Sequence, residues 1–154
     1  MRILGIRTSS QEIRYAIVEW NGTKATLLNT SSESWLTFPA SAHTNAAKLY
    51  FLDQELERIL SAKPPFDRIA LKVNEFVMRR AESSASRESA YYDAAVLLAA
   101  GRWGIPVDTF FHNQIGTNSR EVKAYAEAKV GRTTMYWNEQ MADAVAVAFK
   151  VTQS

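Results

Sequence analysis

Three segments rich in apolar and β-forming residues follow one another at the start of the chain, and only then do helix-like and strand-like segments alternate. Asn21-Gly22, between the second and third segments, is the dipeptide that most strongly favours a tight hairpin turn. Strands joined by short turns pair antiparallel, whereas a strand that follows a helix normally joins the sheet in parallel. The order βββαβαβαα therefore predicts an α/β fold with a mixed five-stranded sheet and helices on both faces.

The boundaries of these elements follow from apolar periodicity and from capping and turn residues. In the second predicted helix, we expect Ala90, Ala94, Leu97, Leu98 and Gly101 to form the apolar face. The predicted strands span 2–7, 13–20, 25–29 (resuming near 35–38), 67–73 and 107–111, and the predicted helices span 45–62, 84–103, 120–130 and 139–150.

Composition narrows the class of protein. The chain has 154 residues, of which 47 % are hydrophobic and 22 % charged, so we expect one globular domain over residues 1–154. It has no cysteine, which excludes disulfides, thiolate metal sites and cysteine nucleophiles. No apolar run reaches the length of a membrane span, and the first ten residues do not form a signal peptide. We therefore expect a cytoplasmic protein with no membrane partner.

Five segments, taken in order, resemble the RuvC-type Holliday junction resolvases of the RNase H-like superfamily. ILGIRTSS at 3–10 is similar to the family's opening ILGIDPGS, and DRIALKVNEFVM at 67–78 resembles its acid-bearing strand and the loop that follows. AAVLLAA at 94–100 and GIPVDTFF at 104–111 resemble its long helix and fifth strand. ADAVAVAF at 142–149 resembles its last catalytic helix, DAADALAIA. The resemblance implies the same fold over nearly the whole chain.

The resemblance also implies a catalytic set of four carboxylates, which hold two divalent metal ions that activate water. In this sequence Arg7 stands at the first acid position and Lys72 at the second, unless Glu75 serves there instead. The third position falls on Gln140, and only the fourth, Asp143, is still an acid. Three of the four expected metal-binding acids are thus replaced, which predicts a degraded catalytic centre.

Electrostatics makes metal binding at these positions unfavourable. A like charge at the metal position repels the ion, and one pair of unit charges 4 Å apart is worth roughly 4 kcal/mol at an effective dielectric near 20. Arg7 and Lys72 are instead suited to pair with Asp143. We therefore expect no bound metal and no catalytic residues, unless a rebuilt site of Glu75, Glu139 and Asp143 holds Mg²⁺.

Candidate nucleic-acid contacts cluster after the fourth strand, where the corresponding resolvase loop approaches DNA. Phe76 stands where that loop carries a wedge residue, and basic side chains follow it. Acidic neighbours dilute this charge, so a solvated surface is the competing interpretation. The candidate nucleic-acid-binding residues are Phe76, Arg79, Arg80 and Arg87 in and beside this loop, and Lys123 on the next predicted helix, which could extend the basic surface along phosphates.

Three functions remain open on the sequence alone. The first is a catalytically inactive RuvC-like protein that binds structured or branched DNA or RNA. The second is a protein–protein interaction module whose old active site is sealed by ion pairs, and the third is a nuclease with a rebuilt metal site. Tyr91 and Tyr92 cannot both face inward from one helix, and RuvC-type resolvases are two-fold dimers, so we also expect a homodimer.

Overall fold

The computed structural model describes residues 1–74 and 84–154. Its elements follow the predicted order. The strands are β1 (Arg2–Thr8), β2 (Glu12–Trp20), β3 (Ala25–Leu27), β4 (Trp35–Thr37), β5 (Arg68–Lys72) and β6 (Val107–Phe110), and the helices are α1 (Asn45–Leu60), α2 (Ser84–Trp103), the 3₁₀ turn η1 (His112–Gln114), α3 (Val122–Lys129) and α4 (Glu139–Val151).

The strands form one mixed sheet in the order β3-β2-β1-β5-β6. β1 and β2 pair antiparallel, whereas β1, β5 and β6 pair in parallel. The predicted third strand is split, because β3 and β4 both pair with β2 but are separated by residues 28–34. Asn29 explains the interruption, since its side chain accepts from the Ile17 amide and donates to the Tyr15 and Glu33 carbonyls. The sheet therefore has six strands where five were predicted, because β3 and β4 together take the place of the predicted third strand.

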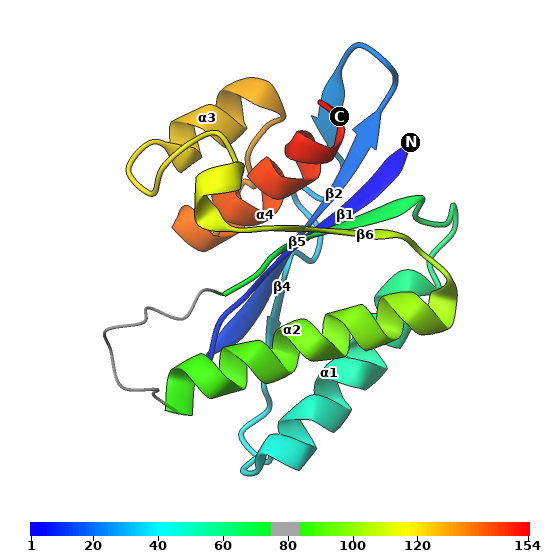
Figure 1. The fold of residues 1–154 in the computed structure, drawn as a ribbon, viewed down its shortest axis with the longest axis vertical. Coiled ribbons are helices and arrows are strands. Elements are labelled where there is room, and N and C mark those ends of the chain that lie inside the picture. Colours follow the sequence, from blue (N-terminus) through cyan, green and yellow to red (C-terminus); the bar gives the residue numbers. More distant parts are fainter. Residues whose placement is uncertain (75–83) are drawn as a thin grey trace.

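Helices cover both faces of this sheet (Figure 1). α1 and α2 lie on one face, over a core that includes Leu4, Ile69 and Val96. α4 lies on the other face with α3 outside it, so that every α4 residue from Met141 to Ala148 is buried. No helix in the described parts of the chain is long and apolar enough to cross a membrane.

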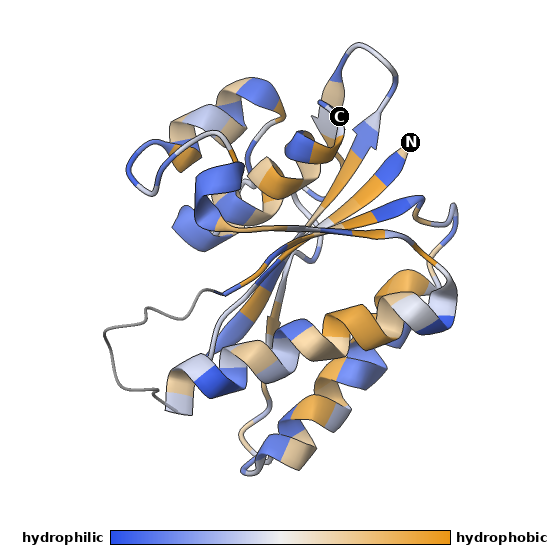
Figure 2. Cartoon of the chain, in the orientation of Figure 1, coloured by the Kyte–Doolittle hydropathy of each residue, from blue (hydrophilic) through white to orange (hydrophobic). Residues whose placement is uncertain are grey.

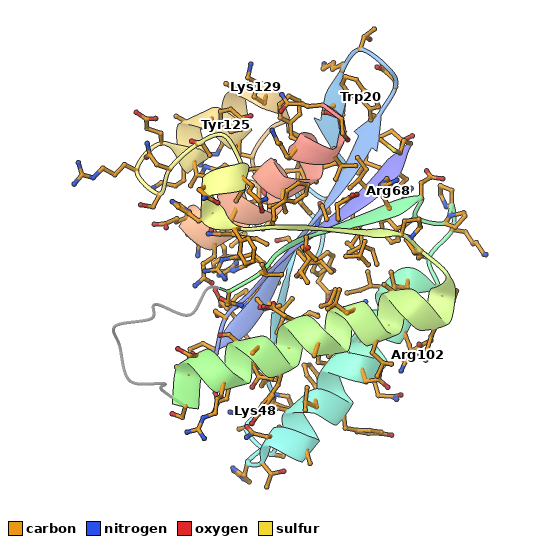
Figure 3. All side chains as sticks on the ribbon, viewed as in Figure 1. Trp20, Lys48, Arg68, Arg102, Tyr125 and Lys129 are labelled. Atoms are coloured by element: carbon orange, nitrogen blue, oxygen red, sulfur yellow. The ribbon has the colours of Figure 1, made fainter. Side chains whose placement is uncertain are left out.

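Ion pairs join α1 to α2 on the outside of their layer. Figure 3 labels Lys48 and Arg102, which lie toward opposite ends of this helix pair. Lys48 contacts Glu88, and Arg102 contacts both Asp53 and Glu57. Exposed pairs of this kind contribute little stability each, so the layer is held mainly by its apolar contacts with the sheet.

Gly5 sets how closely α4 approaches the sheet. A Cβ atom added at Gly5 would lie 2.0 Å from the Ala144 carbonyl oxygen and 2.9 Å from the Ala148 Cβ. α4 therefore packs directly on the β1 backbone, and its small side chains make this contact possible. The close approach brings the start of α4 to the ends of β1 and β5.

The predicted apolar face of α2 is wrong. Ala94, Leu97, Leu98 and Gly101 are exposed, and Figure 2 shows apolar residues on the outward side of this helix. The helix is apolar on two sides, so its sequence periodicity does not single out one face. The residues that α2 buries against the sheet are Ser89, Tyr92, Asp93, Val96, Ala99 and Ala100.

Candidate functional site

Three charged residues meet where β1, β5 and the first turns of α4 come together. Arg7 is the next-to-last residue of β1 and lies beside Lys72, the last residue of β5, in the parallel register. Asn138 caps α4 by accepting a hydrogen bond from the Met141 amide, which fixes where the helix starts. Asp143 then lies one turn into α4 and faces the two strand ends. We call Arg7, Lys72 and Asp143 the Asp143 cluster.

The Asp143 carboxylate receives both cations. Its Oδ2 atom accepts from Lys72 Nζ at 2.8 Å and from Arg7 Nε at 3.3 Å. The Asp143 and Lys72 side chains are only 4 % and 9 % exposed, and Arg7 is 18 % exposed. The prediction that Asp143 lies within salt-bridge reach of Arg7 or Lys72 is confirmed, and it holds for both cations.

A second buried carboxylate stands next to this cluster. Asp93, on α2, accepts hydrogen bonds from the Thr8 hydroxyl and from both the backbone and side-chain nitrogens of Asn74. Asn74 in turn accepts from Arg7 Nη1 at 2.7 Å. The Asp93 network, formed by Thr8, Asn74 and Asp93, thus joins α2 to the Asp143 cluster through one amide side chain.

Together the cluster and the network balance their charge, because Arg7 and Lys72 are cations and Asp93 and Asp143 are carboxylates. Charges that are largely removed from water need such compensation, since an unpaired buried ion is strongly destabilising. Each carboxylate also accepts two or more hydrogen bonds. The arrangement is therefore a closed, internally satisfied ion-pair site.

The residues of this site do not fit a divalent metal ion. Mg²⁺ requires oxygen ligands, whereas Arg7 and Lys72 place donor nitrogens against the one carboxylate that remains at the expected positions. In residues 1–74 and 84–154, no three His, Asp or Glu side chains gather as a metal site would need.

The other sequence-based candidates lie elsewhere or outside the described residues. Gln140 is partly buried, with its Oε1 atom unpartnered among the described residues, and Glu139 is exposed in the first turn of α4. Arg87 and Lys123 are exposed on α2 and α3, which lie in opposite helical layers. Glu75, Phe76, Arg79 and Arg80 lie outside the described residues.

Sequence reasoning missed Asp93 and its partners. One signal was present, because Asp93 is the only charged residue between Glu88 and Arg102 in a helix that is otherwise largely apolar. A lone acid in such a helix is normally paired when it is buried. Its partners Thr8 and Asn74 come from two other strand ends, which only the folded sheet brings together.

Comparison with known proteins gives a structural likeness. No family model matches the sequence, and no curated protein matches it either. A Thermus thermophilus RuvC solved in complex with a Holliday junction substrate superposes with a TM-score of 0.78 at 20 % identity, over 97 % of this chain and 91 % of that one. A second Thermus thermophilus RuvC structure gives 0.75 at 20 % identity, over 97 % and 92 %.

A more distant likeness extends to a eukaryotic protein. The yeast mitochondrial Holliday junction resolvase superposes with a TM-score of 0.58 at 11 % identity, over 99 % of this chain and 78 % of that one. The chain therefore has a RuvC-type fold.

Proposed function

We propose that this protein binds structured nucleic acid through a RuvC-type fold without cleaving it and without a metal cofactor. The observation that carries the proposal is the Asp143 cluster. Arg7 and Lys72 occupy strand-end positions where the family resemblance places metal-binding acids, and both bind Asp143. Arg7 and Lys72 neutralise Asp143 and so take the place of the metal ions. Without metal ions, the protein has no means at this site to activate water for cleavage.

The binding half of the proposal rests on fold likeness and on local charge. The Thermus thermophilus RuvC of the same fold was solved with a Holliday junction substrate. The net charge of this chain is only +2, so attraction to phosphates must come from local groups of basic residues rather than from the whole molecule. Arg79, Arg80, Arg87 and Lys123 are the sequence-based candidates for those contacts.

A cleavage and binding assay tests both halves. With a labelled four-way DNA junction, we expect a retarded complex and intact strands after incubation with Mg²⁺ or Mn²⁺. Arg79→Ala combined with Arg80→Ala is expected to weaken binding and to make its salt dependence shallower, by nearly one unit of slope per lost phosphate contact. Gel shifts across a salt series, read beside denaturing gels, provide both measurements.

Lys24→Ala is the matched control, because Lys24 is exposed in the turn between β2 and β3, at the opposite end of β1 from Arg7. It should leave the affinity and the salt slope unchanged. Metal-dependent cutting that disappears in Asp143→Asn protein would overturn the inactive assignment and favour the rebuilt site. Absence of binding to every junction and single strand would overturn the nucleic-acid assignment.

A second candidate function, assembly with a protein partner, is favoured by the outer face of α2. Tyr91, Leu97 and Leu98 are exposed on this helix, and Leu98 is 62 % exposed. Ala94 and Gly101 lie on the same stripe at helical spacing and permit close approach of another helix. We propose that this face pairs with its counterpart in a second copy of the chain, forming a homodimer.

Leu98→Asp is expected to shift the protein from dimer to monomer, because a charge would enter an apolar contact between two copies. Sedimentation equilibrium or light scattering across a concentration series measures the change. Leu28→Asp is the control, since Leu28 is also an exposed leucine, at 45 %, but follows β3 rather than lying on α2. A wild-type chain that stays monomeric at high concentration would contradict the dimer.

A further inference from the structure

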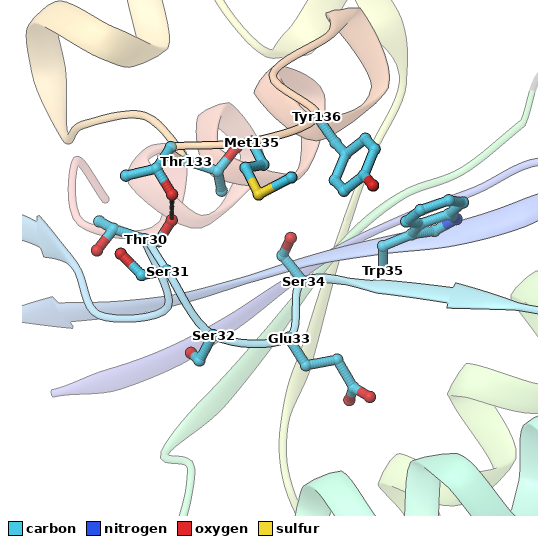
Figure 4. Close-up of a pocket in the computed structure, with 10 residues that line it drawn as sticks. Thr30, Ser31, Ser32, Glu33, Ser34, Trp35, Thr133, Met135 and Tyr136 are labelled. Atoms are coloured by element: carbon cyan, nitrogen blue, oxygen red, sulfur yellow. Dashed lines mark hydrogen bonds between the residues drawn. The ribbon is translucent and has the colours of Figure 1, made fainter.

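A pocket separate from the Asp143 cluster opens between two loops, residues 30–35 and residues 133–136 (Figure 4). We call it the Trp35 pocket. Its volume is about 270 Å³, at or below the lower end of the range for small-molecule sites, so it accommodates one ring system rather than a large ligand. Serine and threonine hydroxyls line much of it, and aromatic and methionine side chains form one wall.

The aromatic wall of the pocket is open to solvent. The Tyr136 ring lies 5.0 Å from the Trp35 ring at an interplanar angle of 55°, and Tyr136 is 57 % exposed. Tyr136 also has a φ of +58°, a left-handed conformation that aromatic residues rarely adopt. Strained backbone of this kind concentrates at ligand-binding sites. The fold therefore holds an aromatic ring at the mouth of the pocket in an unfavourable backbone conformation.

Buried polar atoms at the pocket lack partners. Thr133 Oγ1 and Trp35 Nε1 make no hydrogen bond within the described residues. Thr133 is only 2 % exposed. Most buried polar groups in folded proteins are hydrogen-bonded, so an unpartnered group at a pocket indicates that a water molecule or a ligand completes it.

The charges around the pocket exclude a phosphate as its direct ligand. Glu33 is the only charged residue in the lining, and Figure 4 shows its carboxylate directed away from the opening. Burial opposes its ionisation, but hydrogen bonds from Tyr15 and Arg58 outweigh this and hold the pKa of the Glu33 carboxyl below its usual value. The pocket thus offers hydroxyls and aromatic faces, which suit a neutral, planar group with hydrogen-bonding edges.

The sheet register connects this pocket to the Asp143 cluster. Trp35 pairs with Arg14, Arg14 pairs with Arg7, and Arg7 pairs with Lys72 across four adjacent strands. The Arg14 guanidinium lies 4.6 Å from the centre of the Trp35 ring. Because neighbouring strands are roughly 4.8 Å apart, the Trp35 and Arg7 backbones are about 10 Å apart. A nucleic acid that lies over the strand ends beside the cluster would therefore also lie near the pocket.

We propose that the Trp35 pocket binds one unpaired nucleobase, which stacks on Tyr136 and hydrogen-bonds to the hydroxyls of the 30–34 loop. The inference rests on the proposed nucleic-acid-binding function and deepens it, because it names unpaired nucleotides as the preferred ligand. A base within a duplex has both faces covered by its neighbours and its pairing edge occupied. Stacking on an exposed aromatic ring is the usual means of holding a base that is not stacked in a helix.

The test uses oligothymidylate that carries one 2-aminopurine, whose fluorescence falls when the base stacks on an aromatic ring. Wild-type protein should quench this signal. Tyr136→Gly removes the ring and suits the left-handed backbone, so it should fold while weakening single-strand binding by about tenfold. Tyr136→Phe keeps the ring and should retain both quenching and affinity. Tyr50→Ala is the control, since Tyr50 is 69 % exposed on α1, far along the chain from the pocket.

The outcomes separate the two proposals. If wild-type protein binds neither single strands nor junctions, the proposed function fails and this inference fails with it. If wild-type protein binds but Tyr136→Gly quenches and binds as well as wild type, the pocket proposal is overturned while the proposed function stands. An equal loss of affinity for fully paired duplex would also overturn it, because the pocket would then not distinguish unpaired bases.

Discussion

Asp143→Ala is expected to lower the free energy of unfolding by about 3–5 kcal/mol, because it leaves two largely buried cations without their shared carboxylate. Arg7 would keep its hydrogen bonds to the Thr8 carbonyl and to Asn74, but among the described residues Lys72 Nζ would have no remaining ion-pair partner. Urea denaturation followed by circular dichroism measures the change, and the midpoint should fall while the slope of the transition stays constant.

Asp108→Ala is the matched control for this prediction. Asp108 accepts two hydrogen bonds from Arg68, at 2.7 and 2.8 Å, so its pairing geometry is at least as good as that of Asp143. The Arg68 and Asp108 side chains are 37 % and 31 % exposed, and water screens their attraction. Loss of this pair should therefore lower stability by only about 0.2–1 kcal/mol. Similar losses in the two variants would contradict the importance of burial at the Asp143 cluster.

Most of the fold was predictable from local signals in the sequence. The hairpin between β2 and β3 was predicted from Asn21-Gly22, and Gly22 adopts a positive φ of 98°, although the loop spans residues 21–24 instead of two residues. The ends of α2 and α4 follow from Gly104 and Asn138, which stop and cap their helices. Such signals act over a few residues, so the sequence alone is enough to place them.

The buried face of α2 was not predictable in this way. Leucines lie on its outer side, whereas Asp93 and Ser89 lie on its inner side, which reverses the usual arrangement of polar and apolar residues. Asp93 is tolerated inside because Thr8 and Asn74 satisfy it, and both come from strand ends that are distant in sequence. Hydrophobic periodicity carries no information about such long-range partners.

In the candidate sites, too, one part could be predicted from the sequence and another part could not. Arg7, Lys72 and Asp143 could be brought together from the sequence, because the family resemblance assigns their positions to strand ends and a helix start that meet in one fold. The Trp35 pocket could not be found in this way. It depends on the break between β3 and β4 and on the left-handed backbone of Tyr136, and neither has a sequence signature that separates it from an ordinary loop.

Reversing both cations of the Asp143 cluster should convert it into a metal-dependent site. With Arg7→Asp and Lys72→Glu, three carboxylates would face one another and Asp93 would lie close by, with no cation among the four positions. Like charges about 4 Å apart cost roughly 4 kcal/mol per pair at an effective dielectric near 20, so without metal this variant should be several kcal/mol less stable than wild type. Oxygen ligands at the ends of β1, β5 and α4 are the set that Mg²⁺ requires.

We therefore expect the melting temperature of this double variant to fall in EDTA and to rise with Mg²⁺ or Mn²⁺. A ligand that binds only the folded state stabilises that state by mass action. At a ligand concentration one hundred times the dissociation constant, the gain is about 2.7 kcal/mol. Arg7→Asn with Lys72→Gln is the control, since it removes both cations without adding carboxylates and should show no response to metal. The wild-type chain should show none either, because Arg7 and Lys72 already neutralise Asp143. If the double variant folds but its melting temperature is the same with and without Mg²⁺ or Mn²⁺, these strand ends do not form the metal position of the RuvC-type fold.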